Sequence, residues 1–200
     1  MRLIVAIATT GRPDVVRQTI RQISEQKTIP DLVLVVVATP EDVDATALTG
    51  LSFAVEVLQS PRGLTLQRNA ALELLEQDDL MIFLDDDFVM AADYLTNLKS
   101  LFAQQPDIVM ATGAVLADGI HGPGLSHEDA RQIIGNTTSE PDNAVNDIYN
   151  CYGCNMALRA SPVVQSKLRF DERMKLYAWL EDVDFSRQMA AHGRIVKSSN

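Results

Sequence analysis

An unbroken apolar run that ends in three adjacent carboxylates constrains this chain most. The run Leu80–Leu84 is followed directly by Asp85, Asp86 and Asp87. A short apolar run rich in Leu, Ile and Phe predicts a strand that is buried on both faces, as in a parallel sheet. The three acids would then lie at the carboxyl edge of the sheet, where open α/β sheets bind their ligands.

Three adjacent carboxylates repel one another, and this repulsion favours a bound hard cation. Mg²⁺, Mn²⁺ and Ca²⁺ all take carboxylate oxygens as ligands. The alternative is an acidic turn that caps the next helix, and the triplet alone leaves both interpretations open. A calcium loop of the EF-hand type does not fit, because Phe88 and Val89 follow Asp87 where that loop needs a glycine.

The first half of the chain alternates predicted strands and helices. Besides the central strand, β-rich apolar runs predict strands over residues 3–8, 31–38, 53–58 and 107–112. Helical spacing of apolar residues predicts helices over residues 13–23, 42–48, 64–75 and 93–102. This repeated order predicts a single α/β domain with a mostly parallel central sheet, right-handed crossovers and flanking helices.

The second half of the chain is less regular. Several Gly and Pro residues among polar ones predict that residues 117–147 form mostly a long loop, with one short helical piece near 127–134. Such long loops are usually functional or disordered. Residues 155–159 are predicted to return to the sheet, and Ser161 followed by Pro162 indicates a helix start.

A second acidic cluster follows Trp179, at Glu181, Asp182 and Asp184. The apolar spacing beyond Glu181 predicts a helix whose first turn holds these acids, as its dipole favours. A solvated first turn is the alternative. A carboxylate beside Trp179 in a partly dry cleft would have its pKa raised towards that of a useful base. A metal-holding cluster and a proton-accepting cluster together suit transfer of a group from a nucleoside diphosphate to a hydroxyl.

Composition narrows the function classes. The formal net charge of -10 argues against a nucleic-acid-binding surface. No apolar run reaches the length of a membrane span, and the N-terminus leads directly into a strand, so we expect a cytoplasmic location. Cys151 and Cys154 form one Cys-x-x-Cys without a second pair, which predicts two reduced, partly buried thiols.

Five segments occur in an order that resembles one enzyme family. They are residues 5–13, 63–70, 83–87, 153–159, and 170–172 with 179–182. In this order they resemble the family 2 glycosyltransferases, which have the GT-A fold, and the likeness runs from Leu3 almost to Gly193 with a divergent middle. The resemblance implies a nucleotide-sugar-binding half over 1–113 and an acceptor-binding half over 114–200, incomplete at its C-terminus.

The resemblance also implies roles for individual residues. Donor binding would fall on Thr9, Thr10, Arg12, Asp42, Arg68, Asp85 and Asp86. Asp87, with Asp85, would ligate Mn²⁺ or Mg²⁺ that bridges the diphosphate oxygens. Asp182 would be the general base that activates the acceptor hydroxyl, with inversion at the anomeric carbon. Trp179 and Glu181 would shape the acceptor site.

The implied ligands are a UDP-sugar or GDP-sugar donor and a saccharide or lipid-linked acceptor, in a role such as polysaccharide biosynthesis. A lipid-linked acceptor would imply a peripheral contact with the inner face of a membrane.

Two features depart from the family pattern. The second strand is followed by residues 38–42, Ala-Thr-Pro-Glu-Asp, instead of an acidic pair and Gly-Ser, with Asp42 as a substitute base reader. The chain also stops at Asn200, before the region where many relatives supply a metal-binding His, so we expect a truncated domain. His121, His127 and His192 are not convincing replacements.

Three rival functions remain open at this point. Asp85-x-Asp87-x-Val89 also resembles the nucleophile loop of haloacid-dehalogenase-like phosphatases, although that loop normally ends the first strand and three strands precede it here. A sugar nucleotidyltransferase should show a longer glycine-rich opening loop than Thr10 to Pro13. Outside enzymes, the domain could be a catalytically dead binding module.

Overall fold

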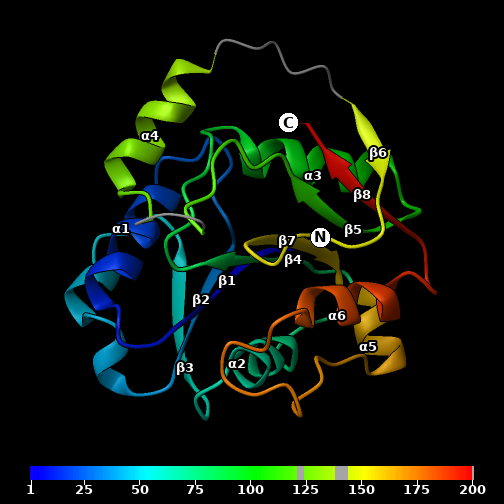
Figure 1. The fold of residues 1–200 in the computed structure, drawn as a ribbon, viewed down its shortest axis with the longest axis horizontal. Helices are drawn as coiled ribbons and strands as arrows, with labels where there is room; N and C mark the ends of the chain where they lie inside the picture. Colours follow the sequence, from blue (N-terminus) through cyan, green and yellow to red (C-terminus); the bar gives the residue numbers. More distant parts are fainter. Residues whose placement is uncertain (121–123, 138–143, 200) are drawn as a thin grey trace.

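The structure, a computed structural model, describes residues 1–120, 124–137 and 144–199. Within these residues one sheet has eight strands in the order β3-β2-β1-β4-β7-β5-β8-β6 (Figure 1). The strands are β1 (Leu3–Thr9), β2 (Leu32–Val37), β3 (Ala54–Gln59), β4 (Leu80–Asp85), β5 (Ile108–Gly113), β6 (Val145–Asp147), β7 (Asn155–Arg159) and β8 (Arg194–Ser198).

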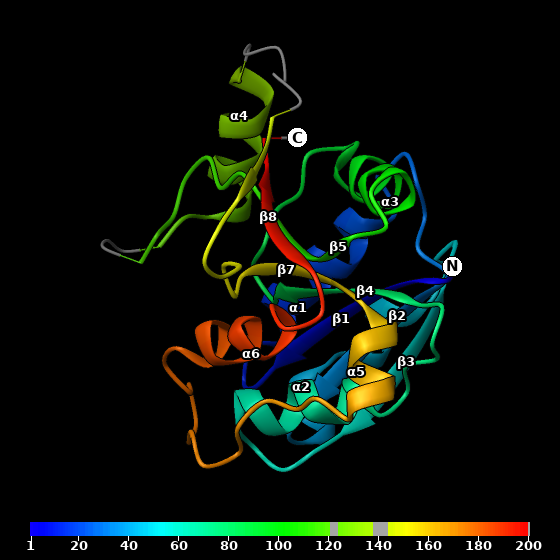
Figure 2. The same ribbon diagram turned by 90° about the vertical axis from the view of Figure 1, so that its right-hand side faces the viewer.

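Helices cover both faces of the sheet, and the views in Figures 1 and 2 agree on this arrangement. Side chains of α1 and α3 pack into the core on one face, and those of α2, α5 and α6 pack on the other. The α-helices are α1 (Pro13–Ile23), α2 (Leu64–Leu72), α3 (Tyr94–Gln104), α4 (His127–Asn136), α5 (Ala160–Ser166) and α6 (Glu181–Met189). Two 3₁₀ turns, η1 (Pro40–Asp42) and η2 (Ala45–Leu48), follow β2.

The sheet is mostly parallel, as the sequence predicts. β1 pairs in parallel with β2 and β4, and β2 pairs in parallel with β3. β7 then lies antiparallel between β4 and β5. β8 continues the sheet parallel to β5, and β6 closes it antiparallel to β8.

Burial explains why the central strands are apolar throughout. All six residues of β2 are buried, as are the first five of β4, because helices cover both faces there. On α1, Val16, Ile20 and Ile23 are fully buried and face the sheet at helical spacing. By contrast, β3 lies at the edge of the sheet, and half or more of its residues are exposed.

The second half differs from the sequence prediction in several details. The strands β6 and β8 were not predicted. Val145–Asp147 is short, and Arg194–Ser198 contains two charged residues, Arg194 and Lys197. The helix α5 begins at Ala160, so Ser161 lies inside it instead of capping it. In the first half, the helix predicted over 42–48 is wrong, because the chain there forms two 3₁₀ turns. The helical piece near 127–134 is confirmed as α4, while residues 121–123 and 138–143 of the predicted loop lie outside the described residues.

Candidate active site

A cleft of about 1340 Å³ lies at the carboxyl end of β4. Asp85 and Asp87 line it from the strand end, and Asp182 lines it from the first turn of α6. Residues of α2, α3 and α4 also line the cleft. Figure 1 shows these three helices by their labels. The structure therefore brings together the two acidic clusters that lie far apart in the sequence.

The three consecutive aspartates at the end of β4 have different environments. Asp85 lies with one carboxylate oxygen 3.6 Å from Nη2 of Arg68. Asp86 is buried, and its carboxylate accepts a hydrogen bond of 2.6 Å from the hydroxyl of Thr9. The side chain of Asp87 is 53% exposed. Asp85 and Asp87 thus face the cleft, whereas Asp86 anchors the strand end to β1.

Arg12 bridges two of these carboxylates from the loop after β1. Its guanidinium lies 2.8 Å from Asp86 and 2.7 Å from Asp87. The backbone at Gly11 has φ of +69°, a conformation that favours glycine, and this turn carries the chain to Arg12. The pKa of Arg12 is raised: burial lowers it, but the hydrogen bond to Asp87 and the nearby negative charges outweigh burial.

Asp42 holds the loops after β1 and β2 together. Its carboxylate accepts hydrogen bonds from the backbone N–H groups of Gly11, Ala38 and Thr39, at 2.6 to 2.9 Å. Asp42 is buried and does not line the cleft. In this geometry it shapes the loop that carries Arg12, while its role in reading a nucleotide base stays a prediction.

Arg68 and Glu181, predicted to serve the donor and the acceptor, form a buried ion pair with each other. Nη1 of Arg68 lies 2.5 Å from Oε1 of Glu181, and Nη2 donates to the carbonyl of Gly153 at 2.9 Å. The guanidinium also lies 5.5 Å from the ring centroids of both Phe83 and Phe170. The pair therefore joins α2 to the first turn of α6 in the lining of the cleft.

Asp182 is held by backbone amides at the start of α6. One carboxylate oxygen accepts a hydrogen bond of 3.0 Å from the N–H of Gly153, and the other accepts from the N–H of Val183 at 2.8 Å. A Cβ at Gly153 would lie 3.1 Å from Oε1 of Glu181 and 3.5 Å from Asp182. Glycine at this position therefore allows the loop before β7 to approach both acids closely.

An exposed aromatic pair borders the cleft next to Asp182. Tyr177 and Trp179 line it, and their ring centroids are 5.9 Å apart. Leu176, Ala178 and Leu180 beside them have positive φ values, from 53° to 73°. Such strained positions in non-glycine residues cluster at ligand sites. The sequence prediction named Trp179 but missed Tyr177. The short distance between these two aromatic residues in the sequence was a signal that could have indicated Tyr177 as well.

Tyr152 and Asp118 were also missed. Both line the cleft, and the hydroxyl of Tyr152 donates a hydrogen bond to Asp118. Asp118 lies in the divergent middle of the chain, where no motif marks it. Cys154 lines the cleft and Cys151 is buried; both are free thiols, as predicted.

Burial and crowding of negative charge raise the pKa of several carboxyls in the site. Burial raises the pKa of Asp85 most, and the nearby Asp87 and Asp118 raise it further, against the opposing charges of Arg68 and Arg12. Burial also raises the pKa of Asp86 and of Glu181, an effect that Arg12 and Arg68 respectively oppose. A cation in the cleft would relieve the repulsion among these groups.

The end of β4 offers two carboxylates in the cleft to a metal ion, from Asp85 and Asp87. Among the described residues, no group of three or more His, Cys, Asp and Glu side chains is arranged to hold a metal. Mg²⁺ is commonly held by one or two carboxylates, with substrate phosphates and waters as the other ligands. The donor set therefore fits a hard cation that binds together with a phosphate-bearing ligand.

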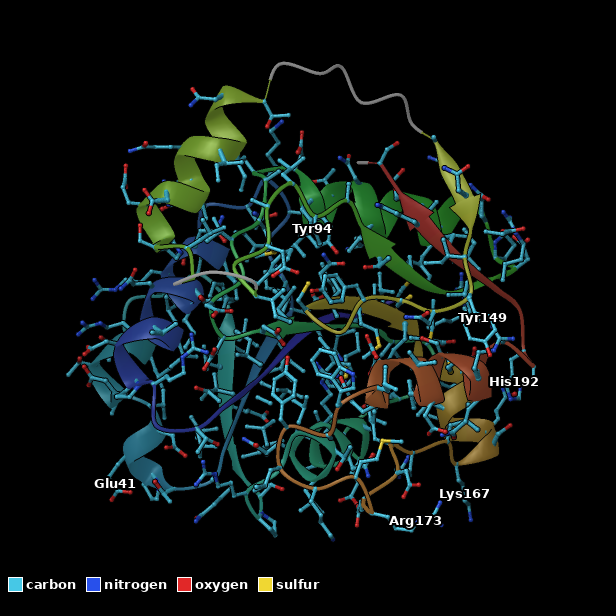
Figure 3. All side chains as sticks on the ribbon, in the orientation of Figure 1. Glu41, Tyr94, Tyr149, Lys167, Arg173 and His192 are labelled. Atoms are coloured by element: carbon cyan, nitrogen blue, oxygen red, sulfur yellow. The ribbon has the colours of Figure 1, made fainter. Side chains whose placement is uncertain are left out.

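The remaining predicted residues lie around the cleft or away from it. Thr9, Thr10, Arg12, Asp42 and Asp86 do not line it, but belong to the two loops and the strand end described above. His127 lies on α4, and His192 lies at the outer edge beyond α6 (Figure 3); neither lines the cleft. His121 lies outside the described residues.

Comparisons with known proteins bear on the family and the fold of the chain. The model of the family described as glycosyl transferase family 2 matches residues 4–165. No curated protein matches the chain. Among the described residues, we find no helix with the length and apolar character needed to span a bilayer.

Several solved structures share the fold. S. aureus TarS has a TM-score of 0.71 at 17% identity, and the match covers 100% of this chain and 35% of TarS. TarS 1-349 in complex with UDP has a TM-score of 0.72 at 17% identity, covering 100% of this chain and 58% of that one. The mannosyltransferase PcManGT from Pyrobaculum calidifontis, in complex with GDP-Man and Mn²⁺, has a TM-score of 0.67 at 16% identity. The match covers 100% of this chain and 56% of PcManGT. These matches confirm the expected GT-A fold, and the chain spans only about a third to three fifths of the proteins it matches.

Proposed function

The chain belongs to glycosyl transferase family 2, and from this premise we propose that it transfers a sugar from a nucleoside-diphosphate sugar to an acceptor hydroxyl. One observation carries the proposal: Asp85 and Asp87 face the same cleft as Asp182. A carboxylate pair suited to a metal and a backbone-held carboxylate suited to a base thus line one cleft, in which a donor and an acceptor would lie side by side. The family membership favours this function over a phosphatase or a nucleotidyltransferase.

The donor would bind at the end of β4. UDP in the TarS structure and GDP-Man with Mn²⁺ in the PcManGT structure support a nucleotide-sugar donor of the UDP or GDP type. Asp87 and Asp85 would hold Mn²⁺ or Mg²⁺. Such a metal, when bound, neutralises the charge that develops on a leaving diphosphate. Arg12 would face the phosphates from the loop after β1, because its guanidinium already pairs with Asp86 and Asp87.

Asp182 would act as the general base. The two N–H groups that contact its carboxylate keep it oriented at the edge of the cleft. As the acceptor oxygen forms its bond to the anomeric carbon, its proton passes to Asp182. The bond between that carbon and the diphosphate oxygen breaks on the opposite face, and the configuration inverts. Positioning of the acceptor and removal of its proton are therefore the work of α6 and the loop before it.

The acceptor would lie against the apolar side of the cleft. The exposed apolar side chains that line it come from the segment after β5, the loop before β7 and the loop before α6, namely Leu116, Ile120, Leu125, Tyr152, Tyr177, Trp179 and Leu180. Aromatic rings such as Tyr177 and Trp179 can pack against the apolar face of a sugar. Both a saccharide and a lipid-linked acceptor present apolar surface. Comparing transfer rates to the two kinds of acceptor would show which one the enzyme uses.

Calorimetry with UDP and with GDP, each with and without Mn²⁺, tests donor binding. We expect heat for at least one nucleotide, and we expect the affinity to fall when Mn²⁺ is omitted. Asp87→Asn should reproduce that loss with Mn²⁺ present, whereas Asp14→Asn, on the exposed start of α1, should not. If neither nucleotide binds under any metal condition, the proposed function is wrong.

Asp182→Asn tests the base. Loss of a general base typically costs about 10² to 10⁴ in rate, so we expect kcat to fall by that factor while donor affinity is kept. Asp184→Asn is the matched control, because Asp184 lies in the same helical turn but bonds to Gln188 and does not line the cleft. If the Asp182→Asn protein transfers the sugar at an unchanged rate, Asp182 is not the general base. A dead binding module would bind the nucleotide without any turnover.

Other expectations stay predictions. The division into a donor half over 1–113 and an acceptor half over 114–200, the cytoplasmic location and a peripheral membrane contact all await experiment. Assaying each nucleotide sugar against soluble and lipid-linked acceptors would identify the donor and the acceptor. Repeating the assay with and without vesicles would test the peripheral membrane contact.

A further inference from the structure

Arg12 holds one carboxylate oxygen of Asp87, a residue that is expected to bind a metal. Its guanidinium donates to Asp87 at 2.7 Å and lies 2.8 Å from Asp86. Asp87 is also one of the two carboxylates at the end of β4 that line the cleft, the other being Asp85. The same carboxylate therefore cannot keep this ion pair and offer all of its oxygens to a metal.

The two ion pairs of Arg12 differ in how firmly they are held. Asp86 is 7% exposed and is fixed by the hydroxyl of Thr9, and its carbonyl accepts from the hydroxyl of Thr19 at 2.6 Å. Asp87 is 53% exposed, and among the described residues Arg12 is its only ion-pair partner. Because exposed ion pairs contribute little free energy, the contact with Asp87 can open while the contact with Asp86 is kept.

We propose that Arg12 is an internal counter-ion of Asp87 that couples metal binding to donor binding. The proposal rests on the proposed function. Without ligands, the guanidinium neutralises Asp87 and competes with the cation. When a metal and a diphosphate enter together, Asp87 turns to the metal and Arg12, still held by Asp86, pairs with a phosphate oxygen, for which its planar fork is suited. Metal and nucleotide then each raise the affinity for the other, as linkage requires.

Manganese binding to the Arg12→Gln protein tests this role without any turnover. Free Mn²⁺ is followed by electron paramagnetic resonance, first with protein alone and then with saturating UDP or GDP. Without nucleotide, we expect the Arg12→Gln protein to bind Mn²⁺ about five- to thirtyfold more tightly than the unsubstituted protein, because a competing positive charge is gone. Its further gain on adding nucleotide should shrink by a similar factor.

Two substitutions serve as controls. Arg12→Lys keeps the charge and should stay within about threefold of the unsubstituted protein. Arg17→Gln removes an arginine of α1 that also pairs with two carboxylates, Asp14 and Asp44, but outside the cleft, and it should change nothing. Arg12→Met, which keeps the apolar stem, replaces the glutamine variant if circular dichroism shows that variant to be unfolded.

The outcomes separate this inference from the function on which it rests. If the unsubstituted protein binds Mn²⁺ with nucleotide but Arg12→Gln binds nucleotide-free Mn²⁺ no more tightly, the coupling role is wrong and the proposed function stands. If Arg17→Gln gains as much as Arg12→Gln, the effect is one of net charge and the role is again wrong. If no nucleotide binds to any of the proteins, both proposals fail.

Discussion

At the scale of single residues, neighbouring carboxylates of the same type do different work because their surroundings differ. Asp86 and Asp87 are adjacent, yet one is buried against Thr9 and the other is half exposed at the cleft. β4 ends at Asp85 and the chain turns over the next two residues, so the three carboxylates leave the backbone in different directions. The sequence prediction grouped these acids, and the structure divides them.

Asp42 provides a residue-scale prediction about stability. Burial raises the pKa of its carboxyl, but hydrogen bonds from the N–H groups of Thr39, Gly11 and Ala38 outweigh burial and hold the pKa below its usual value. Asp42→Asn replaces one acceptor oxygen by an NH2 group, which donates hydrogen bonds and cannot accept them. We expect a loss of about 2–3 kcal/mol in the free energy of unfolding at pH 7, measured by urea denaturation.

The pH dependence of that loss has a defined sign. A carboxyl whose pKa is lower in the folded state stabilises the fold above its unfolded pKa of about 3.9, and this contribution is lost as the pH falls through the folded value. The difference in stability between the unsubstituted protein and Asp42→Asn should therefore be constant from pH 6 to 8 and shrink below pH 4. A difference that grows on acidification would contradict the assignment.

At the scale of elements, the buried pair of Arg68 and Glu181 ties α2 to α6. Removing one partner leaves an uncompensated buried charge, so Arg68→Met and Glu181→Gln should each cost about 3–5 kcal/mol in the free energy of unfolding. The double variant should lose less than the sum of the two single losses. Urea denaturation of the unsubstituted protein, the two single variants and the double variant provides this double-mutant cycle.

The exposed pair of Arg173 and Asp171 is the control for that cycle. Its atoms approach to 2.6 Å, but the side chain of Arg173 is 91% exposed. Arg173→Met should therefore leave the free energy of unfolding nearly unchanged, because solvent screens an exposed ion pair. Equal losses at the buried and exposed pairs would show that burial is not the cause.

Gly153 provides a second element-scale prediction. Gly153→Ala would place a methyl group 3.1 Å from Oε1 of Glu181, so either the loop before β7 or the start of α6 must shift by a few tenths of an ångström. Because Asp182 accepts a hydrogen bond from the same residue, we expect kcat to fall more than nucleotide affinity. Gly135→Ala on α4, where the added methyl meets nothing within 4 Å, is the control.

At the scale of the whole molecule, the cleft is built from both halves of the chain, so a ligand that fills it should stabilise the entire fold. With UDP or GDP and Mn²⁺ at about 100 times the dissociation constant, the expected stabilisation is about 2.7 kcal/mol, which for this size raises Tm by about 5–10 °C. Removing the metal with EDTA should abolish most of that shift. A shift that persists undiminished in EDTA would argue against a metal between protein and diphosphate.

The sequence by itself determined the order of elements in the first half, the burial of β4 and the residues at which chemistry is expected. Local signals sufficed there, because apolar runs, helical spacing and the positions of Gly and Pro act over a few residues. β6 and β8 escaped prediction, since a short or charged strand is stabilised mainly by the neighbour with which it pairs.

Only the tertiary structure decided which of those residues meet. It paired Arg68 with Glu181 across more than a hundred residues, turned Asp42 onto backbone amides and set Arg12 against Asp87. The physical reason is that a charged side chain takes the partner that packing brings within a few ångströms, and the distance between two residues along the chain carries no information about that partner.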